Sequence, residues 1–145
     1  MWFFNIIFFI VVGHFVGAMI LYLNHRFVFH GKLGRLPILS KIKKLHAMHH
    51  AHPDDIWMEE FIFVPIWARV IIASAVMAIG VFINAWIALG LVSFMILYSY
   101  RHYEIHTRDR SSKFYKHHSI HHAVPTHNFS GMYPFIDDIF STTLK

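Results

Sequence analysis

Long apolar segments alternate with polar, histidine-rich segments along this chain. Residues 2–23 contain no Lys, Arg, Asp or Glu, and at a rise of ~1.5 Å per residue a helix of this length crosses a hydrocarbon core of ~30 Å. Residues 61–100 are also apolar and about twice as long as one span, so we expect a helical hairpin that turns near Gly80. The pattern therefore predicts an all-α membrane protein whose polar segments, 24–60 and 101–145, lie outside the hydrocarbon.

A cleaved signal peptide is the alternative interpretation of residues 2–23. Such peptides begin with basic residues, have a shorter apolar run and end at a cleavage site of small residues. The segment shows none of these features. We therefore predict that it is a membrane-spanning helix.

The distribution of positive charge predicts the orientation in the membrane. All thirteen Lys and Arg residues lie within 26–69 and 101–145. By the positive-inside rule, both polar segments are expected on the cytoplasmic side and the N-terminus outside. This topology and contact with anionic lipid account for the net charge of +5, and no nucleic-acid reader motif is present, so we expect no nucleic-acid partner.

The composition is typical of an integral membrane protein. Of the 145 residues, 56% are hydrophobic and only 14% are charged, so we interpret residues 1–145 as a single membrane domain. Cysteine is absent, which excludes disulfides, iron–sulfur clusters held by this chain and thiolate zinc sites. A metal bound by this chain must therefore have nitrogen or oxygen ligands.

Histidines supply the candidate nitrogen ligands. Ten of the fourteen form four short clusters in the polar segments: His25 and His30; His46, His49 and His50; His102 and His106; and His118, His121 and His122. Residues i, i+3 and i+4 share one face of a helix, so we expect the three histidines of each H-x-x-H-H motif to converge on one point. The i and i+4 pair of the third cluster should form a two-ligand clamp.

The first cluster does not fit a regular α-helix. His25 and His30 are five residues apart, which places them about 140° apart around the helix axis. They can face one point only if the helix ends or changes between them. A local π-type turn is one possibility, and termination before Gly31 is the other.

The number of histidines indicates the kind of metal site. Ten imidazoles are too many for one ion and fit two, whereas a closed structural zinc site needs only four ligands. The alternative is a set of surface histidines without a designed site, but four clusters on one predicted side of the membrane argue against it. We therefore expect a dinuclear catalytic centre that acts on a lipid.

Polar residues near the clusters are candidates for hydrogen bonds to the outward nitrogens of the ligands, which would fix their tautomers. The candidates for this supporting role are Asp54, Asp137, His117 and His127. His14 lies within the first apolar segment, and we interpret it as a packed polar residue.

The chain resembles the membrane-bound fatty acid hydroxylase superfamily, which includes sterol desaturases and carotenoid hydroxylases. The motifs that carry the resemblance are HRFVFHG at 25–31, HAMHH at 46–50, HYEIH at 102–106, HHSIHHAVPTHNFSG at 117–131 and IDDIFST at 136–142. Within the superfamily, the chain is most similar to fatty acid 2-hydroxylases, which have a similar HRF-x-FH motif.

The resemblance implies a di-iron oxygenase that uses dioxygen to hydroxylate a lipid C–H bond. All ten clustered histidines would then be metal ligands, with two iron ions in the active form and zinc possible in the isolated protein. The substrate would be a lipid from the bilayer. The chain carries no haem or flavin motif, so a separate electron donor is expected, such as a b-type cytochrome with its reductase or a ferredoxin.

Other functions remain open from the sequence. A carotenoid hydroxylase, or a sterol or lipid desaturase, would use the same histidines. A non-catalytic membrane metal-binding protein is the remaining alternative. An ion transporter should carry polar ligands across the hairpin, but residues 70–100 contain no His, Asp, Glu, Lys or Arg.

Overall fold

The protein is helical throughout the residues that the structure describes. The computed structural model describes residues 2–53, 66–107 and 111–145, and within these ranges it contains no strand, which confirms the all-α prediction. The helices are α1 (Trp2–Leu23), the π-helix η1 (Asn24–Phe29), the 3-10 helix η2 (Leu33–Arg35), α2 (Pro37–Ala51), α4 (Ile66–Ile83), α5 (Ala85–Thr107), α6 (Lys113–Ala123) and α7 (Pro134–Ile139).

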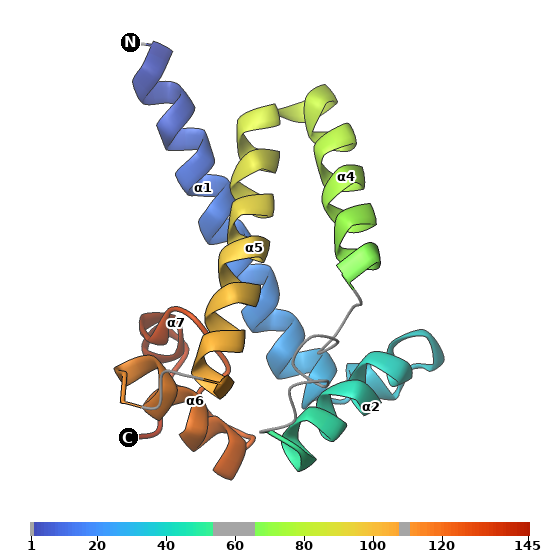
Figure 1. Ribbon diagram of the computed structural model, residues 1–145, viewed down its shortest axis with the longest axis vertical. Coiled ribbons are helices and arrows are strands. Elements are labelled where there is room, and N and C mark those ends of the chain that lie inside the picture. Colours follow the sequence, from blue (N-terminus) through green and yellow to red (C-terminus); the bar gives the residue numbers. More distant parts are fainter. Residues whose placement is uncertain (1, 54–65, 108–110) are drawn as a thin grey trace.

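Three long helices form the upper part of the molecule, and the short helices gather at its lower end (Figure 1). Helices α4 and α5 form the helical hairpin that the sequence predicts, of which residues 61–65 lie outside the described ranges. Asn84 connects the two helices, and its Oδ1 accepts hydrogen bonds from the backbone N–H groups of Trp86 (3.0 Å) and Ile87 (3.2 Å). This side chain caps the start of α5, where the first N–H groups have no partner in the helix.

Glycines allow α1 and α5 to cross with their backbones in contact. A Cβ atom on Gly13 would lie 2.1 Å from the carbonyl oxygen of Ile87, and a Cβ on Gly90 would lie 2.2 Å from that of Ile10. No side chain fits at either position. Small residues at a crossing give the close packing that holds helices together in a membrane, where the hydrophobic effect between helices is weak.

A polar tie reinforces this crossing. His14 Nδ1 lies 2.9 Å from Ser93 Oγ, and His14 Nε2 lies 2.7 Å from the Tyr133 hydroxyl. Ser93 donates its own proton to the Gly90 carbonyl, so His14 Nδ1 donates to Ser93 and Nε2 accepts from Tyr133. His14 is therefore the packed polar residue that the sequence predicts, and it joins α1 to α5 and to the C-terminal segment.

A small core fastens the C-terminal segment to the lower part of α1 and α5. It consists of Ala18, Tyr22, Phe94, Phe129 and Ile136. The Tyr22 hydroxyl lies 3.0 Å from Thr142 Oγ1, so this core brings the end of the chain against the end of α1.

One continuous helix is long and apolar enough to cross a membrane, among the residues described. It comprises α1 and η1, Trp2–Phe29. Residues Val70–Ile83 of α4 are apolar over a shorter length. The three-segment topology with a cytoplasmic histidine face stays a prediction.

Candidate metal centre

The lower end of the molecule brings histidines from four helical segments, η1 with its C-cap, α2, α5 and α6, into two groups. The first group comprises His25, His30, His46, His50 and His121. The second comprises His49, His106, His118 and His122. Within each group, one ring nitrogen from every histidine lies within 4.8 Å of the others, so each group could hold a metal ion.

Each H-x-x-H-H motif is divided between the two groups, which corrects the expectation that its three histidines converge on one point. In α2, His46 and His50 face the first group and His49 faces the second. On a helix, residues i and i+4 differ by only about 40° in direction, whereas residue i+3 turns about 60° to the other side of residue i. Two helices that each carry the motif can therefore serve two ions at once, and α6 repeats the division with His121 in the first group.

A π-helix brings His25 and His30 into the same group although they are five residues apart. The backbone N–H of His30 donates to the His25 carbonyl at 3.1 Å, a hydrogen bond that spans five residues. Residues five apart in a π-turn lie nearly one above the other, so both imidazoles reach the same group. This confirms that the backbone is irregular here, with a π-turn that joins the two histidines and a helix end at Phe29, before Gly31.

The nitrogen positions in the first group fit ligands of one metal ion. His46 Nε2 lies 2.6 Å from His30 Nε2, 3.0 Å from His50 Nε2 and 3.1 Å from His25 Nε2. A ring nitrogen carries at most one proton, so it cannot donate to three neighbours. Ligand nitrogens about 2.1 Å from a common ion are about 3 Å apart when their directions are perpendicular, which is close to the observed spacing.

Backbone carbonyls fix the orientation of two ligands in the first group. His25 Nδ1 lies 2.5 Å from the Phe129 oxygen, and His121 Nδ1 lies 2.7 Å from the His127 oxygen. A carbonyl only accepts, so both Nδ1 atoms are protonated. In the neutral imidazoles, each Nε2 then has a free lone pair that points into the group, as a metal ligand requires.

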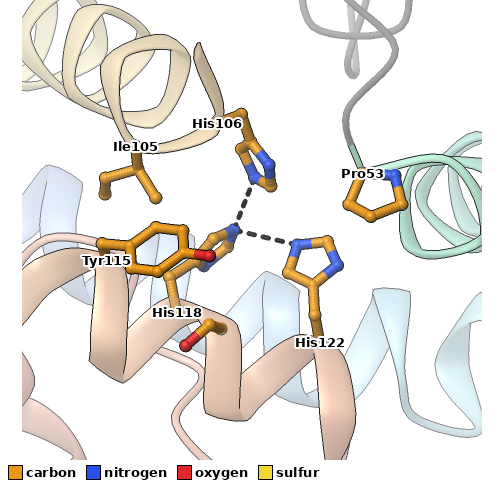
Figure 2. Close-up of a pocket in the computed structure, with 7 residues that line it drawn as sticks. Pro53, Ile105, His106, Tyr115, His118 and His122 are labelled. Carbon is orange, nitrogen blue, oxygen red and sulfur yellow. Dashed lines mark hydrogen bonds between the residues drawn. The ribbon is translucent and has the colours of Figure 1, made fainter. Parts of the chain in front are cut away.

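The second group is built from α2, α5 and α6. Figure 2 shows three of its members, His106 from α5 and His118 and His122 from α6. His118 Nε2 lies 2.9 Å from His106 Nε2 and 3.1 Å from His122 Nε2. A pocket of about 140 Å³ opens beside these three side chains, with Tyr115 on its wall. The second group therefore has an open side.

His102 is buried beside the second group but is not one of its four members. Its ring centroid lies 4.7 Å from that of His106, 4.8 Å from His118 and 5.0 Å from His49. The structure thus brings nine of the ten candidate ligands into the two groups and places the tenth against them.

Burial favours the neutral form of the imidazoles, which is the form that binds metals. Burial and, to a lesser extent, the neighbouring imidazoles and Lys43 lower the pKa of His30 to about 3. Burial also lowers the pKa of His121 to about 4, although its hydrogen bond to His127 opposes the shift. The same cause lowers the pKa of His118. A cluster of neutral nitrogen donors fits a transition metal such as iron or zinc.

The structure gives different positions and contacts to the predicted supporting residues, which are Asp54, Asp137, His117 and His127. Asp137 is fully buried, and its carboxylate lies 3.0 Å from His117 Nε2. His127 acts through its backbone carbonyl, while its Nδ1 lies 3.0 Å from Thr126 Oγ1. Asp54 lies outside the described residues.

Asp137 holds the loop that supports the first group. Its Oδ1 accepts from the backbone N–H of Phe129 and its Oδ2 from that of Ser130, both at 2.8 Å. Thr142 donates to Oδ1 at 2.7 Å. The carboxylate thus fixes the peptide whose carbonyl accepts from His25.

Sequence reasoning missed the backbone carbonyl of Phe129 and the side chain of Asn128. Asn128 is fully buried with φ of 55°, a conformation that asparagine tolerates better than most residues. Its amide donates to the carbonyls of His117 (3.1 Å) and Leu144 (3.0 Å) and accepts from the Leu144 N–H (2.7 Å). The sequence signal for Asn128 was its position between the last histidine cluster and Asp137.

A comparison with protein families supplies the decisive match. Residues 10–142 match the family described as Fatty acid hydroxylase. The chain belongs to the fatty acid hydroxylase family. The match includes all ten clustered histidines and Asp137. Comparisons with curated proteins and with solved structures found no match.

Membership of the fatty acid hydroxylase family gives the two histidine groups a chemical context. Together with the long apolar helix α1, it indicates a membrane protein and an oxidoreductase of the hydroxylase or desaturase type. The nitrogen-only donor sets fit the two iron ions that are typical of the family. The subtype within the family is a separate question.

Proposed function

We propose that this protein is a membrane-bound di-iron oxygenase that hydroxylates a C–H bond of a fatty acyl chain. The observation that carries the proposal is the pair of histidine groups, five and four nitrogen ligands each within 4.8 Å, in a chain of the fatty acid hydroxylase family. Two adjacent sets of neutral ligands are more than a structural metal site requires. We assign all ten clustered histidines as ligands, with His102 completing the second set.

Iron bound by these histidines would supply the activation of dioxygen. The overall reaction combines a C–H bond, dioxygen, two electrons and two protons, and it yields an alcohol and water. The two electrons come from a partner, for which a b-type cytochrome with its reductase or a ferredoxin is the class we propose. The substrate enters from the bilayer, and the histidine end of the molecule faces the cytoplasm.

The residues of the chain have separate tasks in this reaction. The imidazoles hold the metals in neutral form, and the carbonyls of Phe129 and His127 keep the Nε2 lone pairs of His25 and His121 directed inward. Asp137 keeps the supporting loop in place. A ligand set fixed before the substrate arrives reduces the rearrangement that the reaction needs.

The test begins with metal content. Protein purified in detergent without a histidine tag is analysed for iron, zinc, copper and nickel, and we expect about two ions per chain. His49→Ala should lower this ratio, whereas His52→Ala, at an exposed histidine next to the same helix, should leave it unchanged. A ratio near zero or one in the unaltered protein would overturn the dinuclear assignment.

The second stage identifies the reaction. The iron-loaded protein is given a reductant, an acyl lipid and ¹⁸O-labelled dioxygen, and the product is examined by mass spectrometry. One labelled oxygen atom per product molecule supports hydroxylation. A product that is two hydrogens lighter and carries no label would assign a desaturase instead.

A further inference from the structure

A second pocket lies beside the first histidine group. Its volume is about 260 Å³, and three ligand candidates, His30, His46 and His50, form part of its wall. The apolar part of the wall includes Phe29 and Pro125. A pocket that touches three candidate ligands is a place where a substrate can approach the metal.

Lys43 is the charged residue in the wall of this pocket. Four wall residues, Lys43, His46, Ala47 and His50, come from α2 at positions i, i+3, i+4 and i+7, which form one continuous stripe along a helix. Lys43 therefore lies one turn from His46, on the same face.

The structure holds the Lys43 side chain in a defined position. Its Nζ donates to the Gly31 carbonyl at 2.7 Å. Its stem packs over Gly34, where a Cβ atom would lie 2.7 Å from Lys43 Cδ. One of the three ammonium protons is used by Gly31, which leaves two for a ligand in the pocket.

The surrounding charge favours an anion. Among the described residues, the wall includes Lys43 and no Asp or Glu. A half-buried ammonium beside apolar side chains can bind one anionic group strongly.

We propose that this pocket binds the anionic headgroup of a lipid, a carboxylate or a phosphate, with Lys43 as its counter-charge. The proposal rests on the proposed function, and it names a specificity-determining residue for that reaction. The volume is smaller than the ~300–1,000 Å³ of pockets that enclose a whole drug-sized ligand, so it fits a headgroup and the first carbons. The remaining chain extends out of the pocket.

The position of Lys43 also sets the end of the lipid that reacts. An anion on Lys43 places the carbons closest to the charged group beside His30, His46 and His50. Hydroxylation is therefore directed toward the headgroup end of the chain. Neutral lipids such as sterols and carotenoids offer no anionic group to pair with the ammonium.

The test measures binding by calorimetry on the metal-loaded protein in detergent, with three ligands of equal chain length: octanoate, octyl phosphate and octanol. We expect an anion to bind more tightly than octanol, and the comparison of octanoate with octyl phosphate identifies the headgroup. Lys43→Met should weaken binding of that anion about tenfold or more and leave octanol unchanged.

Three further variants separate charge from structure. Lys43→Gln keeps an N–H donor for Gly31 without the charge and should lose anion binding, whereas Lys43→Arg should retain it within about threefold. Lys44→Met, at an exposed neighbour, removes the same charge and should change nothing. Metal content is measured for every variant.

Two outcomes would overturn the proposal. One is that octanol binds the unaltered protein as tightly as the anions. The other is that Lys43→Gln, with its metals retained, binds the anions like the unaltered protein or no more weakly than Lys44→Met does. Either result in a protein with two metals would leave the oxygenase proposal standing, whereas absence of the metals would remove that proposal first.

Discussion

The two histidine groups are built on the same plan from different parts. Each takes an i, i+4 pair from one H-x-x-H-H helix and a single histidine from the other helix. The first group adds His25 and His30 from a π-helix, whereas the second adds His106 from the regular helix α5, with His102 beside it. Helices α2 and α6 each contribute histidines to both groups. The two groups therefore share these helices and differ in the third segment, which is η1 with its C-cap His30 in the first group and α5 in the second.

The groups also differ in what supports them from outside. In the first group, two imidazoles donate to carbonyls of the loop that Asp137 holds. In the second, Nδ1 of His118 and Nδ1 of His122 are buried and have no hydrogen-bond partner among the described residues, as is also true of Nδ1 of His46 and His50 in the first group. Two of the five histidines in the first group are therefore tied to the C-terminal segment, a tie that the described contacts do not show for His118 or His122 of the second group.

The largest effect should follow from removing one ligand from each group. His121→Ala leaves four histidines in the first group, and His118→Ala leaves four in the second when His102 is counted as its fifth ligand. Both should reduce hydroxylation by more than the ~10–100-fold typical of changes outside the ligand shell. Elemental analysis should show that both variants hold less metal than the unaltered protein, to a similar extent.

The metal content of these variants also tests the role of His102. If His118→Ala instead loses clearly more metal than His121→Ala, then the second group has only four ligands, and the buried His102 is not one of them. His52→Ala serves as the control, because this exposed histidine belongs to neither group.

The next largest effect should come from Asp137→Asn. Each carboxylate oxygen accepts two hydrogen bonds, and an amide nitrogen in place of one oxygen would face two donors. We expect the metal affinity of the first group to fall by ~10–100-fold and that of the second to be unchanged. Competition with a chelator measures both affinities.

Asp138→Asn is the matched control for this prediction. Asp138 is the exposed neighbour, and its carboxylate accepts from Thr143 rather than from the supporting loop. Equal loss of metal from both groups in Asp137→Asn would show that the C-terminal segment supports the whole centre, and the difference in support between the groups would then be wrong.

The sequence predicted the helical fold and the irregular turn between His25 and His30, because hydrophobic length and helical periodicity are local properties. It did not predict the division of each H-x-x-H-H motif. Adjacent positions such as His49 and His50 turn about 100° from each other, and only the placement of η1, α5 and α6 around α2 decides which group each side chain joins.

The support by the Phe129 carbonyl was also beyond sequence reasoning. A backbone acceptor leaves no trace in the residue type, and the contact with His25 joins positions 104 residues apart. Asp137 was predictable as a supporting acid, but its main partners are backbone N–H groups, which every residue except proline carries.

A moderate effect is expected at Asn128, which holds the loop at its other end. Asn128→Ala removes three hydrogen bonds and places alanine at φ of 55°. We expect a loss of about 1–3 kcal/mol in the free energy of unfolding. Asn128→Gly removes the same hydrogen bonds without the backbone strain, so it should lose less. Denaturation followed by circular dichroism measures both, and equal losses would contradict a contribution from strain.

The smallest effect should come from the polar tie between α1, α5 and the C-terminal segment. His14→Phe removes the hydrogen bonds to Ser93 and Tyr133, and Tyr133→Phe removes only the second. Hydrogen bonds between membrane helices contribute about 0.6 kcal/mol on average, so each variant should lose about 1 kcal/mol of stability or less. If both single variants are destabilised by losing the same hydrogen bond between His14 and Tyr133, the double variant should lose less stability than the sum of the losses in the single variants.

Tyr133 donates its backbone N–H to Ser130 within the supporting loop, so any change in metal affinity should appear in the first group alone. Equal changes in both groups would instead mean that the crossing of α1 and α5 positions the entire centre.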